Sequence, residues 1–200
     1  MEKKAIGIIS AALALNLALF ITKLYVGIST GCLAIYCDGI NNLADSLSCG
    51  VAVFGFAMAA RLDEKQSMRA QSLVSFVTAL AVALTGAYFA YQGAEKLLYP
   101  TLVSFRVNYA VLIAVTAVVK LFMAFMFRRA DRGIPSPVFK TMMLDCFMDF
   151  GITLCALMSF GLSEKLNFAI DGLVSVLIGV IVAIGAIKTL KEQIVFLIKN

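Results

Sequence analysis

The chain has 200 residues, of which 62% are hydrophobic and 14% are charged. A soluble domain is about half apolar and about a quarter charged, so this composition leaves too little polar surface for a water-soluble globule. The formal net charge of +5 lies mostly in short segments between apolar runs. That pattern indicates membrane orientation rather than nucleic-acid binding.

Apolar runs long enough to cross a bilayer core of about 30 Å recur along nearly the whole chain. Backbone polar groups in lipid must be satisfied internally, so each run must form a helix. The predicted spans are residues 6–28, 33–60, 72–98, 107–127, 138–162 and 168–190, followed by an amphipathic cytoplasmic extension over 191–200. We therefore predict an all-α membrane protein with a single transmembrane domain over residues 1–200 and six transmembrane helices, lying in a lipid bilayer.

Lysine and arginine are distributed unequally between the two sides of this predicted bundle. The richer side carries Lys3, Lys4, Arg61, Lys65, Arg69, Arg128, Arg129, Arg132, Lys188, Lys191 and Lys199. The other side carries little more than Lys96, Arg106 and Lys165. The positive-inside rule then places both termini in the cytoplasm. We expect a multi-pass protein of the plasma or inner membrane.

Acidic and amide side chains occur inside two of the predicted spans, where ionisable groups are costly and therefore indicate function. Asp45 and Asp149 lie near the middle of their spans and so near the bilayer midplane. Asn41 and Asp45 are four residues apart, as are Asp145 and Asp149, and such pairs share one helix face. If the two faces meet, three carboxylates and one amide converge on one buried point.

Three carboxylates cannot all remain ionised at such a point without a cation. Some would hold protons when the site is empty, and a divalent metal would displace them. The sequence therefore predicts exchange of a metal ion for protons. Hydrogen bonding between helices, the simpler role, is our interpretation of Asn16 and Asn42.

Other polar residues receive more modest interpretations. Asp38 either lines the outer access path or caps its helix, and Asn42 and Lys140 also belong to a possible access path or second shell of the site. We expect Lys23 and Lys120 to extend toward the lipid headgroups. Asp171 begins the sixth predicted span, where an acid complements the helix dipole.

Several motifs together resemble the cation diffusion facilitator family, and they cover essentially the whole chain. A single Asp-x-x-x-Asp is weak evidence, but two pairs with this spacing, Asn41 with Asp45 and Asp145 with Asp149, on the second and fifth of six helices are specific. The matching stretches are Asn16 to Lys23, Gly27, Gly31, Leu33 to Ser46 with its Asp38 and Asn41, Glu95 to Pro100, Asp145 to Asp149, and Ile170 to Ser175.

The resemblance implies a homodimeric exporter that exchanges metal for protons by alternating access, with no prosthetic group. Carried over by motif, the metal ligands are Asn41, Asp45, Asp145 and Asp149. Zinc-selective relatives usually place histidine in at least one of the two motifs, whereas this chain contains none. Oxygen donors suit harder cations, so we expect Mn²⁺, with Fe²⁺, Co²⁺ and Zn²⁺ as alternatives.

The chain also departs from this family pattern. Relatives usually continue into a cytoplasmic metal-binding domain, and we expect no such C-terminal domain here. The alternatives are a zinc- or iron-type exporter of the same family and a non-transporting membrane scaffold. An intramembrane enzyme is not expected, because Asp38-Gly39 is not followed by the rest of a phosphotransferase motif and a Gly-x-Gly-Asp protease motif is missing.

Overall fold

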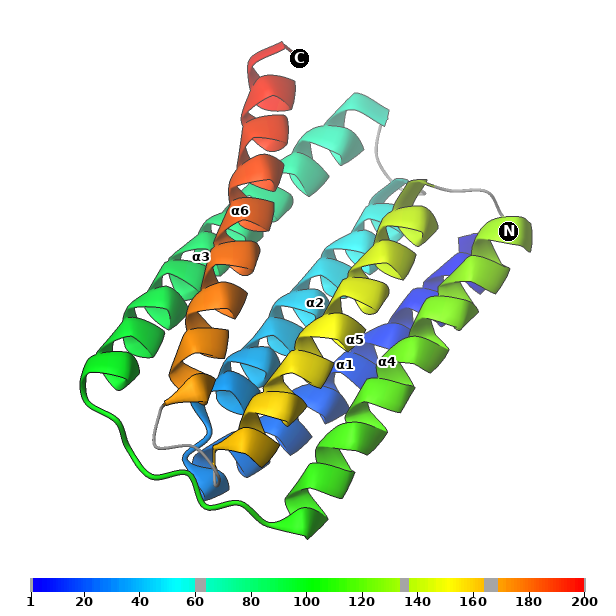
Figure 1. Ribbon diagram of the computed structural model, residues 1–200. Coiled ribbons are helices and arrows are strands. Elements are labelled where there is room, and N and C mark those ends of the chain that lie inside the picture. Colours follow the sequence, from blue (N-terminus) through cyan, green and yellow to red (C-terminus); the bar gives the residue numbers. More distant parts are fainter. Residues whose placement is uncertain (1, 60–63, 134–136, 164–168, 200) are drawn as a thin grey trace.

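The computed structural model describes residues 2–59, 64–133, 137–163 and 169–199, and these residues form helices with short connections and no strand (Figure 1). The predicted all-α fold is confirmed. The six helices of the described ranges are α1 (Glu2–Thr30), α2 (Leu33–Ala59), α3 (Glu64–Leu98), α4 (Val107–Gly133), α5 (Pro137–Leu162) and α6 (Ile170–Lys199). Four residues named in the predictions lie outside this range: Ala60, Arg61, Lys165 and Phe168, and so does the terminal Asn200.

Several helices extend beyond the spans that hydropathy predicts, and α3, α4 and α6 are examples. Helix α3 begins at Glu64 instead of residue 72, and α4 continues to Gly133 instead of residue 127. Helix α6 runs without a break to Lys199, so the segment from residue 191 continues the same helix. Hydropathy marks only the apolar part of a helix, whereas backbone hydrogen bonding continues into polar sequence. The surface location of residues 191–200 stays a prediction.

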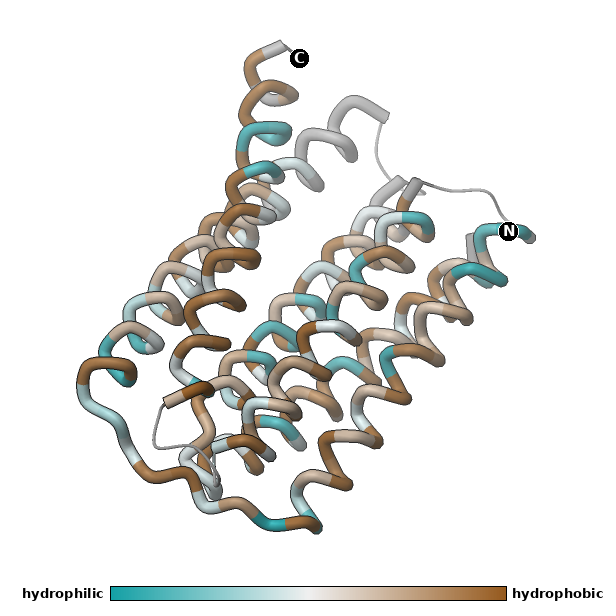
Figure 2. Tube along the Cα trace, viewed as in Figure 1, coloured by the Kyte–Doolittle hydropathy of each residue, from teal (hydrophilic) through white to brown (hydrophobic). Residues whose placement is uncertain are grey.

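In the described ranges, five helices are long and apolar enough to cross a membrane: α1, α3, α4, α5 and α6. Helix α2, of 27 residues, is not among these five, and two aspartates and two asparagines stand within its apolar sequence. Large apolar side chains such as Ile21, Val77 and Phe122 are exposed on the outside of the bundle. Figure 2 shows hydrophobic residues along every helix and hydrophilic residues at positions midway through the bundle. A multi-pass membrane protein accounts for this distribution.

The helices pack mainly in three pairs: α1 with α2, α4 with α5, and α3 with α6. The pair of α3 and α6 lies to one side of the other four helices and diverges from them toward the end where both termini lie (Figure 1). Glycines allow its close packing: a Cβ on Gly179 would lie 2.5 Å from the backbone nitrogen of Ala90 and 2.6 Å from the carbonyl oxygen of Gly86. Small residues are what let helix backbones approach so closely in membranes.

At the opposite end of the bundle, Asp171 joins three helices. Its Oδ2 accepts a hydrogen bond from the Leu33 backbone nitrogen at 3.0 Å and lies 2.6 Å from Lys96 Nζ. Lys96 also donates to the carbonyl oxygen of Gly31, whose φ of 69° forms the turn between α1 and α2. Asp171 is in the first turn of α6, as predicted, but its carboxylate also caps the start of α2.

Candidate metal centre

Two carboxylates and one ammonium group meet where the middle parts of α2, α4 and α5 pack together. Lys120 Nζ lies 2.7 Å from Asp45 Oδ2 and 2.6 Å from Asp149 Oδ2. The Lys120 side chain is completely buried, and that of Asp45 retains 23% of its exposure. Each residue is near the centre of its helix, so the network lies about midway through the bundle.

Asn41 joins the same network from one turn along α2. Its Nδ2 donates a hydrogen bond to Asp149 Oδ1 at 2.7 Å. Asn41 and Asp45 lie four residues apart, and this spacing directs both side chains toward α5. Asp149 therefore receives a hydrogen bond on each carboxylate oxygen, one from α2 and one from α4.

Asp145, the remaining predicted ligand, lies on the same face of α5 as Asp149 but is exposed. In the part of the chain that the structure describes, no three acidic or cysteine side chains gather closely enough to hold a metal ion. Lys120 accounts for part of this arrangement, because its ammonium group occupies the space between Asp45 and Asp149. The structure thus joins Asn41 to Asp149 directly and Asp45 to Asp149 through Lys120, whereas Asp145 makes no such contact in the network.

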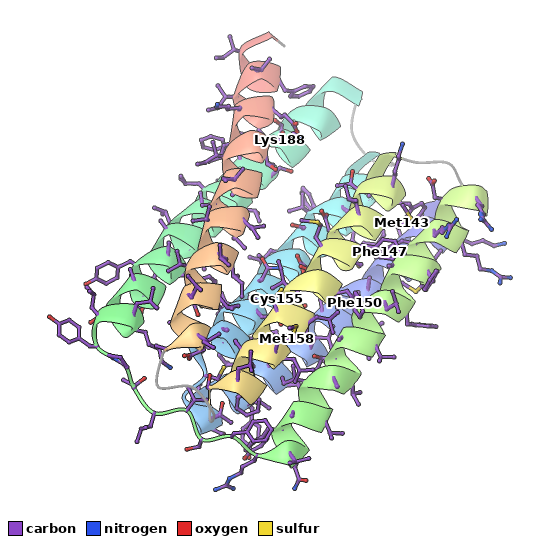
Figure 3. The ribbon with its side chains drawn as sticks, viewed as in Figure 1. Met143, Phe147, Phe150, Cys155, Met158 and Lys188 are labelled. Carbon is purple, nitrogen blue, oxygen red and sulfur yellow. The ribbon has the colours of Figure 1, made fainter. Side chains whose placement is uncertain are left out.

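All four predicted ligands line one cavity of about 680 Å³, which has α3 and α6 on one side and α2 and α5 on the other. The cavity extends from Asn41 and Ile152 to Lys188 and Thr189, toward the end of the bundle that bears both termini. Lys188 lies on α6, where that helix stands apart from α5 (Figure 3). A second cavity of about 500 Å³ lies near Lys96, at the end of the bundle opposite the termini. None of the four predicted ligands lines it.

A second buried ion pair lies farther from the termini. Lys23 Nζ is 2.8 Å from Asp38 Oδ2, and both side chains are almost completely buried. Lys23 also donates to Thr153 Oγ1 at 2.8 Å, and Thr153 donates to the carbonyl oxygen of Asp149. Thr153 therefore connects this pair to the first network.

The structure corrects two interpretations of these charges. Lys23 and Lys120 do not extend toward the lipid headgroups, because both are fully buried against aspartates. Asp38 does not cap its helix, since it is buried against Lys23 while Asp171 caps α2; its place in an access path or second shell of the site stays a prediction. Carboxylates inside the bundle attract these ammonium groups more strongly than distant headgroups do.

The other two secondary candidates lie apart from the carboxylates of the site. Asn42 is buried and donates from Nδ2 to the carbonyl oxygen of Asp38 in its own helix, at 2.8 Å. Lys140 is exposed near the start of α5. Neither is in the lining of the larger cavity.

One sequence signal could have identified Lys120. It stands at the centre of an apolar helix, with thirteen residues on each side. A lysine side chain cannot reach a headgroup from the middle of a core about 30 Å thick, so it must find an internal acid. Thr153 gave no such signal, because its role depends on the approach of α1.

Comparison with known families identifies the class to which these features belong. The bundle is a multi-pass membrane protein with ionisable side chains at mid-depth, as in proteins that move ions. The family model of the cation efflux transmembrane domain matches residues 9–198. The chain belongs to this family of divalent metal cation transporters, which confirms the cation diffusion facilitator resemblance. A search of curated proteins found no match.

Proposed function

We propose that the protein exports a divalent cation, Mn²⁺ in preference to others, in exchange for protons by alternating access. Asn41, Asp45, Asp145 and Asp149 bind the transported ion. The observation that carries this proposal is that all four line one cavity midway through the bundle. Substrate sites of secondary transporters lie near the bilayer midplane between helix groups that move relative to each other.

The formal charges around this site suit a divalent ion. The two networks and Asp145 together contain two lysines and four aspartates: Lys23, Lys120, Asp38, Asp45, Asp145 and Asp149. Within this set of six residues, two negative charges are left without a counter-charge. One divalent cation or two protons would neutralise them, which supports an exchange of the two.

The preference for Mn²⁺ follows from the donor atoms. Carboxylate and amide oxygens are hard ligands that suit Mn²⁺, whereas imidazole suits Zn²⁺. The chain has no histidine, and the cavity lining contains no cysteine. Fe²⁺, Co²⁺ and Zn²⁺ are the competing substrates of the same site.

The orientation of the bundle in the membrane follows from the charge distribution, whereas export as the direction of transport is what the family resemblance implies. The end of the bundle with the termini carries most of the positive residues, including Lys4, Arg128 and Arg132, so we place it in the cytoplasm of a cell with the protein in the plasma or inner membrane. The larger cavity extends toward this end and would admit the ion from the cytoplasm. We also propose a homodimer, as the family resemblance implies.

The proposal is tested by flux into proteoliposomes that contain a metal-sensitive dye and a pH-sensitive dye. We expect Mn²⁺ uptake coupled to opposite proton movement, and loss of both in Asp45→Ala and Asp149→Ala. The matched control is Glu192→Ala, which removes an exposed acid near the end of α6 and should leave both fluxes unchanged. Undiminished Mn²⁺ flux in the two aspartate variants would refute the site.

Asp145→His is expected to shift transport toward Zn²⁺, because it introduces an imidazole beside the carboxylates. Asp145 lines the cavity and is exposed there, so the larger ring fits without displacing a core side chain. The measurement is the ratio of Zn²⁺ to Mn²⁺ flux under identical proton gradients. An unchanged ratio would contradict selectivity by oxygen donors.

A further inference from the structure

Lys120 differs from the other buried lysines in the identity of its partners. Lys23 pairs with Asp38 and Lys96 pairs with Asp171, and neither of these acids is a proposed metal ligand. Lys120 instead contacts Asp45 Oδ2 and Asp149 Oδ2, which are two of the four proposed ligands. An ammonium group within 2.7 Å of both carboxylates takes the place that a bound cation would need.

A metal ion and this ammonium group cannot both bind those carboxylate oxygens strongly. Both are positive, and two like charges a few ångströms apart in a buried site repel strongly. Metal binding at Asp45 and Asp149 therefore requires Lys120 to move away from them. A buried ammonium group without a partner is costly, so the displaced group needs another acceptor.

The structure contains such an acceptor next to Lys120. Asn16 on α1 is buried, and its Oδ1 has no hydrogen-bond partner in the described residues. Its Nδ2 makes only a long contact of 3.8 Å with Cys49 Sγ. Asn16 and Lys120 line the same small cavity of about 40 Å³, together with Asp45 and Asp149. A buried carbonyl oxygen without a partner is rare and calls for an explanation.

We propose that the Lys120 ammonium group is a tethered cation that competes with the transported metal for Asp45 and Asp149, and that it moves to Asn16 Oδ1 when the metal binds. This inference rests on the proposed function. It gives the site a means of release, because transport needs an ion to bind well enough to enter and weakly enough to leave. Lys120 is thus a positioning residue that sets metal affinity through the carboxylates.

The test is calorimetric titration of the purified, detergent-solubilised protein with MnCl₂. Lys120→Met should bind Mn²⁺ at least about tenfold more tightly, since the lower end of measured coupling between close charge pairs corresponds to that factor. Asn16→Ala should bind about tenfold more weakly, because the displaced ammonium group loses a hydrogen bond to its new acceptor. In the Lys120→Met background, Asn16→Ala should have no further effect.

Lys96→Met is the matched control, because it removes a buried, ion-paired lysine distant from the ligands, and its affinity should stay within about twofold of the unaltered protein. Flux measurements add a second readout: Lys120→Met should lower both KM for Mn²⁺ and the maximum rate. A purely structural role would lower the rate without lowering KM.

Unchanged or weaker Mn²⁺ binding by Lys120→Met overturns the inference while leaving the proposed function intact. If that variant does not fold, Asn16→Ala decides the matter, since unchanged affinity there excludes the move to Asn16. Absence of Mn²⁺ binding by the unaltered protein would overturn both the inference and the proposed function.

Discussion

Lys23→Met is expected to destabilise the protein by about 3–5 kcal/mol, which is the usual cost of removing one partner of a buried ion pair. The variant leaves Asp38 without its counter-charge at a position that is completely buried. It also removes the hydrogen bond from Lys23 to Thr153, which links α1 to α5. The free energy of unfolding in mixed micelles, measured by denaturant titration, checks this expectation.

The same pair offers a stringent control. Lys23→Met combined with Asp38→Leu replaces both charges by apolar groups and should recover most of the lost stability, because neither desolvated charge remains. Lys191→Met removes an exposed lysine and should change the unfolding free energy by no more than about 0.5 kcal/mol. A double variant less stable than Lys23→Met would contradict our account of the pair.

Gly179→Ala is expected to cost about 3 kcal/mol and to separate α3 from α6. The added methyl group would lie 2.5 Å from the backbone nitrogen of Ala90, and backbone atoms cannot move aside as a flexible side chain can. Forcing extra volume into a closely packed interface costs about 1–3 kcal/mol, and a backbone contact belongs at the upper end. Denaturant titration of the detergent-solubilised protein measures the loss.

Gly185→Ala provides the comparison on the same helix. A Cβ at Gly185 has no neighbour within 4 Å, so the substitution should be neutral or slightly stabilising. Equal losses in the two variants would contradict the contact of α6 with α3 as the cause, because helix propensity alone favours alanine over glycine. A difference confined to Gly179 would support α3 and α6 as one closely packed unit.

The sequence by itself determined the class of fold and the depth of the polar residues. Runs of apolar residues long enough to cross lipid allow only helices, because no water is present there to satisfy the backbone. The position of a residue along a membrane-spanning helix gives its depth in the bilayer. Asp45 and Asp149 stand near the middle of their helices, so the sequence predicts a depth near the midplane for both. The spacing of four residues also placed Asn41 and Asp45 on one face.

Only the tertiary structure decided which side chains meet. Hydropathy gives the depth of Lys23 and Lys120 but not the neighbours that each side chain faces. The interpretation of these lysines as headgroup contacts was wrong for that reason. Asp171 illustrates the same limit. The sequence predicts that this acid complements the dipole of its own helix, but its carboxylate also caps α2. Partners of buried charges depend on which helices pack together, and small residues such as Gly27 and Gly39, where α1 meets α2, allow this packing.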